Sequence, residues 1–151
     1  MAKFIYRMQN ILSVKEKLET QARNEFAVAS ANLAREEEKL AEMVARKDGY
    51  ASKLKELYSD NLDVQSIKET EDSVEIMKYH IKIQEINVAS ASTQLERARV
   101  KLQEAMQERK THERLKEKQF EQFVAEQAAA ESKEIDELVS YRFGQKGEEN
   151  G

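Results

Sequence analysis

The chain has 151 residues, of which 40% are hydrophobic, 36% charged and 7% aromatic, and its formal net charge is −4. This balance is typical of a long, exposed pair of helices and leaves little material for a compact core, so we expect one coiled-coil domain spanning 1–151. The chain contains no cysteine, which excludes a disulfide framework, a zinc finger and a thiol nucleophile.

No segment approaches the roughly 20 consecutive apolar residues that a membrane-spanning helix needs, so we expect no direct membrane insertion. The first fifteen residues contain Lys3, Arg7 and Lys15 and no acid, a pattern that amphipathic targeting peptides share. The same residues also begin a helical apolar pattern. We therefore favour a cytoplasmic protein, which the absence of cysteine fits.

Residues 4–58 are predicted to form the first helix, because apolar residues recur there at steps of three and four. Two successive steps of four make a stutter near Ala22, where a coiled coil locally unwinds. Glu36 and Lys47 occupy positions on the apolar seam. Polar seam residues reduce stability but can specify the register of two helices.

Turn-forming residues cluster at 59–63, where the apolar pattern of the first helix ends. We predict that the chain reverses direction there. Ser59, Asp60 or Asp63 is expected to cap the second helix. Gly49 is the alternative site of reversal, since glycine disfavours a helix interior.

The second helix is predicted over 64–143, and it has the clearest pattern in the chain. Every seventh residue from Ile67 to Leu102 is aliphatic, and the companion positions carry alanine at Ala91, Ala98 and Ala105. A strict seven-residue period gives a narrow seam suited to one partner helix in a supercoil. The sequence therefore predicts an all-α, antiparallel two-helix coiled-coil hairpin, with closely approaching helices at the alanines.

The second helix is longer than the first, so its last part, from about residue 117 to 143, lacks a partner in the same hairpin. A helical stripe continues through it, formed by Phe120, Val124, Ala128, Glu131, Ile135, Leu138 and Arg142. The alternatives are a partner protein, a homodimer, a fold-back of the last helix, or partial fraying. Gly144 is predicted to end the helix, with 144–151 disordered.

No catalytic constellation is found, and we expect neither an enzyme nor a bound cofactor. His80 and His112 are far apart along the sequence, and neither has the ligand spacing of a zinc site. The chain has no glycine-rich phosphate loop. We therefore expect no metal site and no nucleotide hydrolysis by this chain itself.

The charge distribution is uneven along the chain. Residues 59–75 contain six acids and one lysine, whereas 97–118 contain eight basic residues and four acids. These runs are either solvated helix faces or ends that meet differently charged partners. Nucleic-acid binding is not expected, because acids are interleaved with the basic residues and the overall balance is acidic.

Several segments, in order and spacing, resemble one family. They are the run 4–12 (FIYRMQNIL), the segment EEKL at 37–40 with Tyr50, the segments ERK at 108–110 and LKE at 115–117, and KEIDEL at 133–138 followed by Arg142 and Phe143. Together they resemble FliJ, the soluble coiled-coil component of the bacterial flagellar type III export apparatus. The resemblance covers essentially the full length.

This resemblance implies a function in flagellum biogenesis, motility and protein transport. Such proteins form a hairpin similar to the stalk of the rotary-ATPase gamma subunit. They bind the hexameric export ATPase with the end that carries both termini, promote its assembly and activity, and touch the export-gate membrane protein. They are also described as general, cycling export chaperones, and other export chaperones are possible further partners. The expected location is the cytoplasmic face of the membrane at the flagellar base. Injectisome stalk proteins share the architecture, and periodicity does not separate the two systems.

The resemblance also implies two sets of contact residues. The expected ATPase-binding residues lie toward the termini and are Phe4, Met8, Arg109, Lys110, Arg114, Lys116, Phe120, Val124, Ile135 and Leu138. The expected gate-binding residues lie toward the turn and are Met43, Tyr50, Met77 and His80. This sequence departs from the family's pattern at two positions. The family has an aromatic residue at the position of Ser73 and a histidine at the position of Gln84, which lies one turn from His80. Because Met43, Tyr50 and Met77 also occupy seam positions, packing between the helices is the alternative for each.

Two other functions remain open at this point. One is a holdase-type export chaperone that grips client proteins without coupling to ATP turnover. The other is a purely structural coiled coil that homodimerises through the unpaired end of the second helix.

Overall fold

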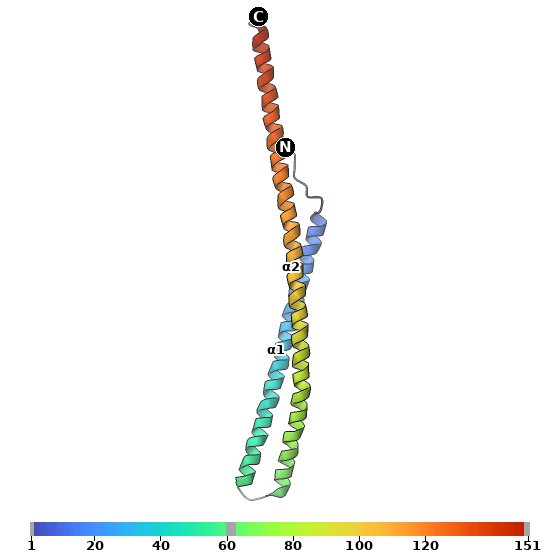
Figure 1. Cartoon of the computed structure of the whole chain (residues 1–151), viewed down its shortest axis with the longest axis vertical. Coiled ribbons are helices and arrows are strands. Elements are labelled where there is room, and N and C mark those ends of the chain that lie inside the picture. Colours follow the sequence, from blue (N-terminus) through green and yellow to red (C-terminus); the bar gives the residue numbers. More distant parts are fainter. Residues whose placement is uncertain (1, 60–62, 150–151) are drawn as a thin grey trace. The chain divides into compact units, whose positions relative to one another are not determined.

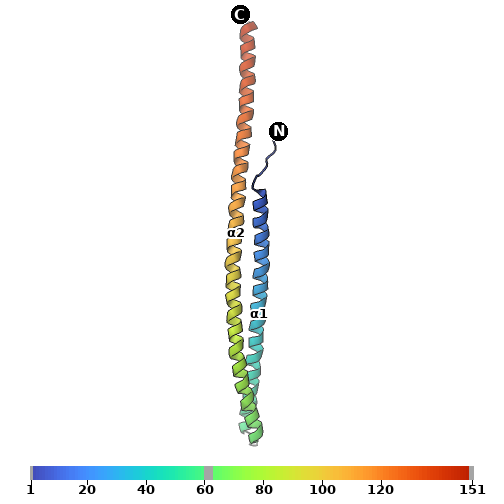
Figure 2. The same cartoon turned by 90° about the vertical axis from the view of Figure 1, so that its right-hand side faces the viewer.

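The computed structural model describes residues 2–59 and 63–149, and within these residues the chain forms two helices and no strand. Helix α1 spans Gln9–Ser59 and helix α2 spans Val64–Glu149 (Figures 1 and 2). The two helices pack against each other as a coiled-coil hairpin in which the second helix is the longer one. This confirms the fold class predicted from the seven-residue period.

The chain divides into two compact units. One, the hairpin unit, spans Glu19–Glu104 and contains the reversal; the other, the terminal unit, combines Met1–Leu18 with Ala105–Gly151. In both views of the hairpin unit, its parts of α1 and α2 run antiparallel beside each other (Figures 1 and 2).

The seam of the hairpin unit is narrow and contains small and polar side chains. Ala22, Ile81 and Ala91 are buried, with exposed fractions of 1%, 9% and 8%. Gln84 is also buried, and its amide donates hydrogen bonds to the Glu36 backbone oxygen (2.8 Å) and to Glu36 Oε2 (2.6 Å). The polar seam position predicted at Glu36 is therefore satisfied from the opposite helix.

Helix α1 begins at Gln9, five residues later than predicted. Residues 2–8, here called the N-terminal strap, are not helical, although the Gln9 amide donates to the Tyr6 carbonyl (3.2 Å) and begins the first turn. The helical apolar spacing at Phe4 and Met8 was therefore misleading. Ring contacts hold Phe4 against α2 instead, and tertiary packing of this kind overrides local propensity.

The predicted reversal lies between the end of α1 at Ser59 and the start of α2 at Val64. Asp63 caps α2: its Oδ1 accepts the Gln65 amide (3.2 Å) and its Oδ2 accepts the Ser66 hydroxyl (2.8 Å). Ser59 instead donates to carbonyls of its own helix, and Asp60 lies outside the described residues. The alternative reversal at Gly49 is wrong, since Gly49 lies inside α1.

Gly144 does not end α2, which continues through Gly144 and Gly147 to Glu149. No described glycine has a positive φ angle, so neither residue forms the left-handed stop that was predicted. Each glycine costs about 1 kcal/mol relative to alanine in a helix. Good helix formers surround them, and Lys146 in the last turn favours the negative end of the helix dipole.

Candidate partner-binding surfaces

The functional residues predicted from the sequence are contact residues for partner proteins, and they lie in both units of the described chain. No group of three or more His, Cys, Asp or Glu in the described ranges could hold a metal ion. A search of the same ranges finds no helix long and apolar enough to cross a membrane. His80 is exposed and His112 is half-buried. The predicted contact residues are therefore considered by where their side chains lie.

In the terminal unit, aromatic packing fixes the N-terminal strap on α2. The Phe4 ring meets the Phe120 ring edge-on, with centroids 5.3 Å apart, and the Phe123 ring at 5.5 Å. Tyr6 and Leu12 are buried, with exposed fractions of 6% and 3%. Phe4 and Phe120, both predicted to contact the ATPase, thus contact each other, and Phe120 remains about half exposed.

Two of the four basic residues predicted to contact the ATPase already interact with other side chains of the terminal unit. Lys116 Nζ donates to Gln9 Oε1 (2.7 Å) and lies 6.0 Å from the centroid of the Tyr6 ring. Arg109 is half-buried and pairs with Glu113 (2.8 Å). Lys116 thus links α2 to the start of α1, whereas the Arg109–Glu113 pair lies within α2, one helical turn apart.

The other two basic residues, Lys110 and Arg114, are exposed and have no ion-pair partner among the residues that the structure describes. Nearby, Lys15 pairs with Glu108 (2.7 Å) and lowers the pKa of that carboxyl. The exposed positive charges in this part of α2 are therefore those of Lys110, Arg114 and Lys118.

Beyond the strap, α2 exposes large apolar side chains. The exposed fractions are 48% for Val124, 60% for Ile135 and 63% for Leu138, and the described side chains from 131 to 147 are all exposed. Because α2 is one uninterrupted helix here, the fold-back alternative is wrong. The stripe predicted from the sequence is present and uncovered within the terminal unit. Met8, also predicted here, is half-buried in the N-terminal strap, just before α1.

In the hairpin unit, the predicted gate residues do not form one exposed surface. Met43 and Met77 are half-buried at seam positions, so packing accounts for them. Tyr50 is 38% exposed, and His80 is exposed with its ring beside Tyr79 at 5.8 Å.

A second apolar stripe on α2, which the sequence analysis missed, lies in the same unit. We call it the outer stripe; it consists of Ile76, Tyr79, Ile83 and Ile86, with exposed fractions of 56%, 63%, 41% and 69%. Their spacing of three, four and three keeps them on one helix face. Each lies two residues after a seam position, which is a rotation of about 200° on a helix. The 3–4–3 spacing of these residues could have indicated the outer stripe from the sequence, but the stronger heptad pattern of the seam obscured it.

Mixed charges surround the outer stripe. Glu75 pairs with Lys78 (3.1 Å), and a shallow cleft of about 390 Å³ beside Tyr79 is lined in part by Lys47, Lys82 and Glu85. An apolar stripe with a rim of both charge signs is the usual form of a face that accepts an amphipathic partner.

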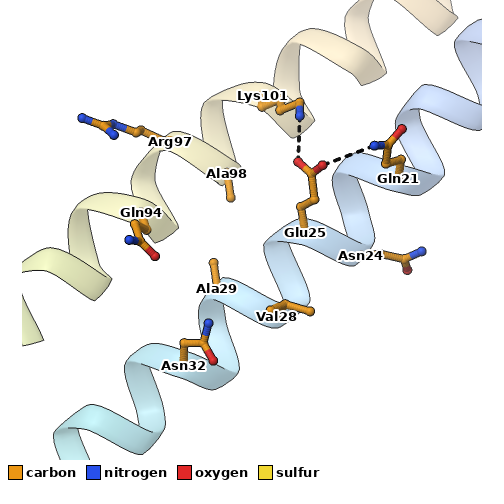
Figure 3. Close-up of a pocket in the computed structure, with 10 residues that line it drawn as sticks. All are labelled: Gln21, Asn24, Glu25, Val28, Ala29, Asn32, Gln94, Arg97, Ala98 and Lys101. Atoms are coloured by element: carbon orange, nitrogen blue, oxygen red, sulfur yellow. Dashed lines mark hydrogen bonds and ion pairs between the residues drawn. The ribbon is translucent and has the colours of Figure 1, made fainter. Parts of the chain in front are cut away.

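A groove of about 640 Å³ runs between the helices where the alanine positions were predicted. Figure 3 shows Ala29 and Ala98 facing each other across it. Glu25 closes one end, since it accepts from Lys101 (2.8 Å) and from Gln21 (3.5 Å). Short side chains leave this space open between the two backbones, so the groove follows from the alanine seam.

Comparisons with known proteins agree with this architecture. The model of the flagellar FliJ protein family matches residues 4–148. The flagellar FliJ protein of Bacillus subtilis (strain 168) is 26% identical over 138 residues, which cover 91% of this chain and 94% of that protein. The solved structure of a YscO homolog from Chlamydia trachomatis shares the fold, with a TM-score of 0.69, 24% identity and coverage of 91% and 94%. Because the family match spans nearly the whole length, this chain belongs to the flagellar FliJ protein family.

Proposed function

We propose that this chain, a flagellar export component by family, is a non-enzymatic stalk and assembly factor. It binds the hexameric export ATPase through the terminal unit and the export-gate membrane protein through the hairpin unit. The observation that carries the first part is the uncovered apolar stripe of α2 at Val124, Ile135 and Leu138. Exposed large side chains arranged along one helix are a common anchor for a protein partner.

The proposed mechanism depends on symmetry. A single helix that enters a six-fold ring cannot contact all six subunits equally, so it favours some subunit conformations over others. This differential binding shifts ring assembly and turnover without chemistry on the stalk itself.

Lys110 and Arg114 supply the electrostatic part of this interaction, because Arg109 and Lys116 already have partners within the chain. We expect the double reversal K110E/R114E to weaken ATPase binding about tenfold and to reduce its dependence on salt. The matched control is K53E/K55E, which reverses two exposed lysines of the hairpin unit. Equal affinity and equal salt dependence for both variants would remove the electrostatic contribution.

The whole proposal is tested by adding the chain to the purified ATPase at about one chain per six ATPase chains and recording hydrolysis together with oligomer mass. Stimulation with hexamer formation at this low ratio is expected. Absence of association at every ratio would contradict the stalk mechanism. Suppression of client aggregation with no change in ATP turnover would instead identify a holdase-type chaperone.

For the gate, we propose the outer stripe as the contact face in place of the seam residues Met43 and Met77. Its four apolar side chains are available without opening the hairpin, whereas the two methionines are part of the contact between the helices. Tyr50 and His80 are exposed and remain proposed contacts, and the His80 ring lies beside the Tyr79 ring of the outer stripe.

A further inference from the structure

We infer that the free end of α2 pairs with the same segment of a second copy of this chain, antiparallel and around a two-fold axis. The pairing face, here called the overhang face, consists of residues that share one side of the helix: Glu131, Ile135, Leu138, Val139, Arg142 and Lys146. This inference does not depend on the proposed ATPase or gate contacts, but Ile135 and Leu138 belong to both the overhang face and the proposed ATPase-binding stripe, so pairing of two copies and ATPase binding exclude each other there.

The apolar centre of the overhang face is short and strongly exposed. Ile135, Leu138 and Val139 have exposed fractions of 60%, 63% and 45%. Their spacing of three and four residues places them within one third of the helix circumference. A partner helix laid along this line would bury all three side chains.

The charges identify the partner and its direction. On the overhang face itself, the acidic half carries Glu131, and the basic half carries Arg142 and Lys146. Antiparallel pairing puts the acidic half of one copy against the basic half of the other, twice by symmetry. Parallel pairing would place like charges together. A second copy therefore complements this face in one direction only.

A single register satisfies both the apolar centre and the charges. If residue i of one copy lies opposite residue 277 minus i of the other, Leu138 meets Val139 of the second copy and Glu131 meets its Lys146. Within the described residues, neither Glu131 nor Lys146 has an ion-pair partner in its own chain. The two-fold axis repeats each of these contacts.

The length of α2 fits the same register. Glu149, the last helical residue, falls opposite residue 128 of the second copy. The last α2 residue that lines the cleft between the strap and α2 is Glu126. The paired segment therefore occupies the part of α2 that the strap does not reach.

The test uses the full chain alone in sedimentation-equilibrium centrifugation over a wide concentration range. We expect a reversible monomer–dimer equilibrium that weakens as salt is raised. E131K alone and K146E alone should each raise the dimer dissociation constant about tenfold, because each places like charges opposite each other at two symmetric positions.

Mixing E131K with K146E should restore association as a heterodimer, because both charge pairs are then complementary. The controls E137K and K133E make the same charge changes on the opposite side of the helix and should associate like the unaltered chain. A chain that stays monomeric throughout, or single reversals that the mixture does not rescue, would overturn the inference. A complex of the chain with ATPase is not needed for either outcome.

Discussion

Gln84 shows how one polar residue can occupy a helical seam without leaving its own groups unpaired. Its side-chain amide donates to both the backbone and the carboxylate of Glu36, and this hydrogen bond, aided by Lys39, lowers the pKa of the Glu36 carboxyl below its ordinary value near 4.5. A lowered pKa in the folded state means that folding favours the ionised form. Glu36 therefore stabilises the hairpin above pH 4.5, and this contribution is lost as the pH falls through the lowered pKa.

We expect Q84L to return the pKa of Glu36 toward its ordinary value, since leucine cannot donate to the carboxylate. Carbon-detected NMR titration of the Glu36 carboxyl measures this directly. Urea unfolding from pH 6 to about pH 3 should show a smaller acid-induced loss of stability for Q84L than for the unaltered chain. Identical titration of Glu36 in both proteins would show that the hydrogen bond does not form in solution.

Gly49 is a second residue whose effect can be isolated. It lies inside α1 with a φ angle that other residues adopt, and a Cβ atom built on it meets nothing within 4 Å. G49A should therefore raise the free energy of unfolding by about 1 kcal/mol. The control G144A makes the same change near the end of α2 and should leave hairpin unfolding in urea unaltered. A decrease in stability for G49A would mean that α1 is bent or open at this position.

At the scale of the helix, α2 carries two different apolar faces. The seam packs against α1, whereas the side chains of the outer stripe are 41–69% exposed. Replacing exposed apolar residues changes stability by less than about 0.5 kcal/mol, while shortening half-buried seam residues costs about 1–3 kcal/mol. The two faces can therefore be separated by measuring stability and binding in the same variants.

We expect Y79S/I83S to weaken binding to the cytoplasmic domain of the export-gate protein tenfold or more, with unfolding little changed. M43S/M77S should instead lower the free energy of unfolding. V28S, at an exposed apolar position of α1 in the same unit, is the matched control and should change neither quantity. The opposite result would be normal gate binding by Y79S/I83S and lost gate binding by M43S/M77S in its folded state. It would mean that the seam residues, and not the outer stripe, bind the gate.

The helix ends and the outer stripe show where prediction from sequence reaches its limit. The seven-residue period from Ile67 sufficed for two helices and their pairing, because a seam requires a partner helix. The start of α1 was missed because Phe4 packs on Phe120 and Phe123, contacts between residues far apart in the sequence. The outer stripe was missed because a search for the strongest apolar period finds the seam and passes over a shorter pattern on another face.

At the scale of the whole chain, the two units and the free end of α2 should differ in local stability. Hairpin residues such as Ala22 and Gln84 are buried against a partner helix, whereas the described side chains from 131 to 147 are exposed. Most of the stability of a helix in a protein comes from packing against other elements. The backbone amides of 131–147 should therefore open readily unless another helix packs on this segment. Amide hydrogen exchange measures this difference in local stability along the chain.

In dilute solution, we expect amides of the hairpin unit to exchange slowest and those of 131–147 to exchange fastest. Raising the protein concentration should slow exchange in the paired segment, which includes 131–147, and should leave the hairpin unit unchanged, because association of two copies covers only the free end of α2. The variant E131K should remove this concentration dependence while leaving protection of the hairpin unit unchanged. Protection of 131–147 that is already high at the lowest concentration, and equal in E131K, would mean that the end of α2 is stabilised within a single chain, against both its exposure here and its proposed pairing.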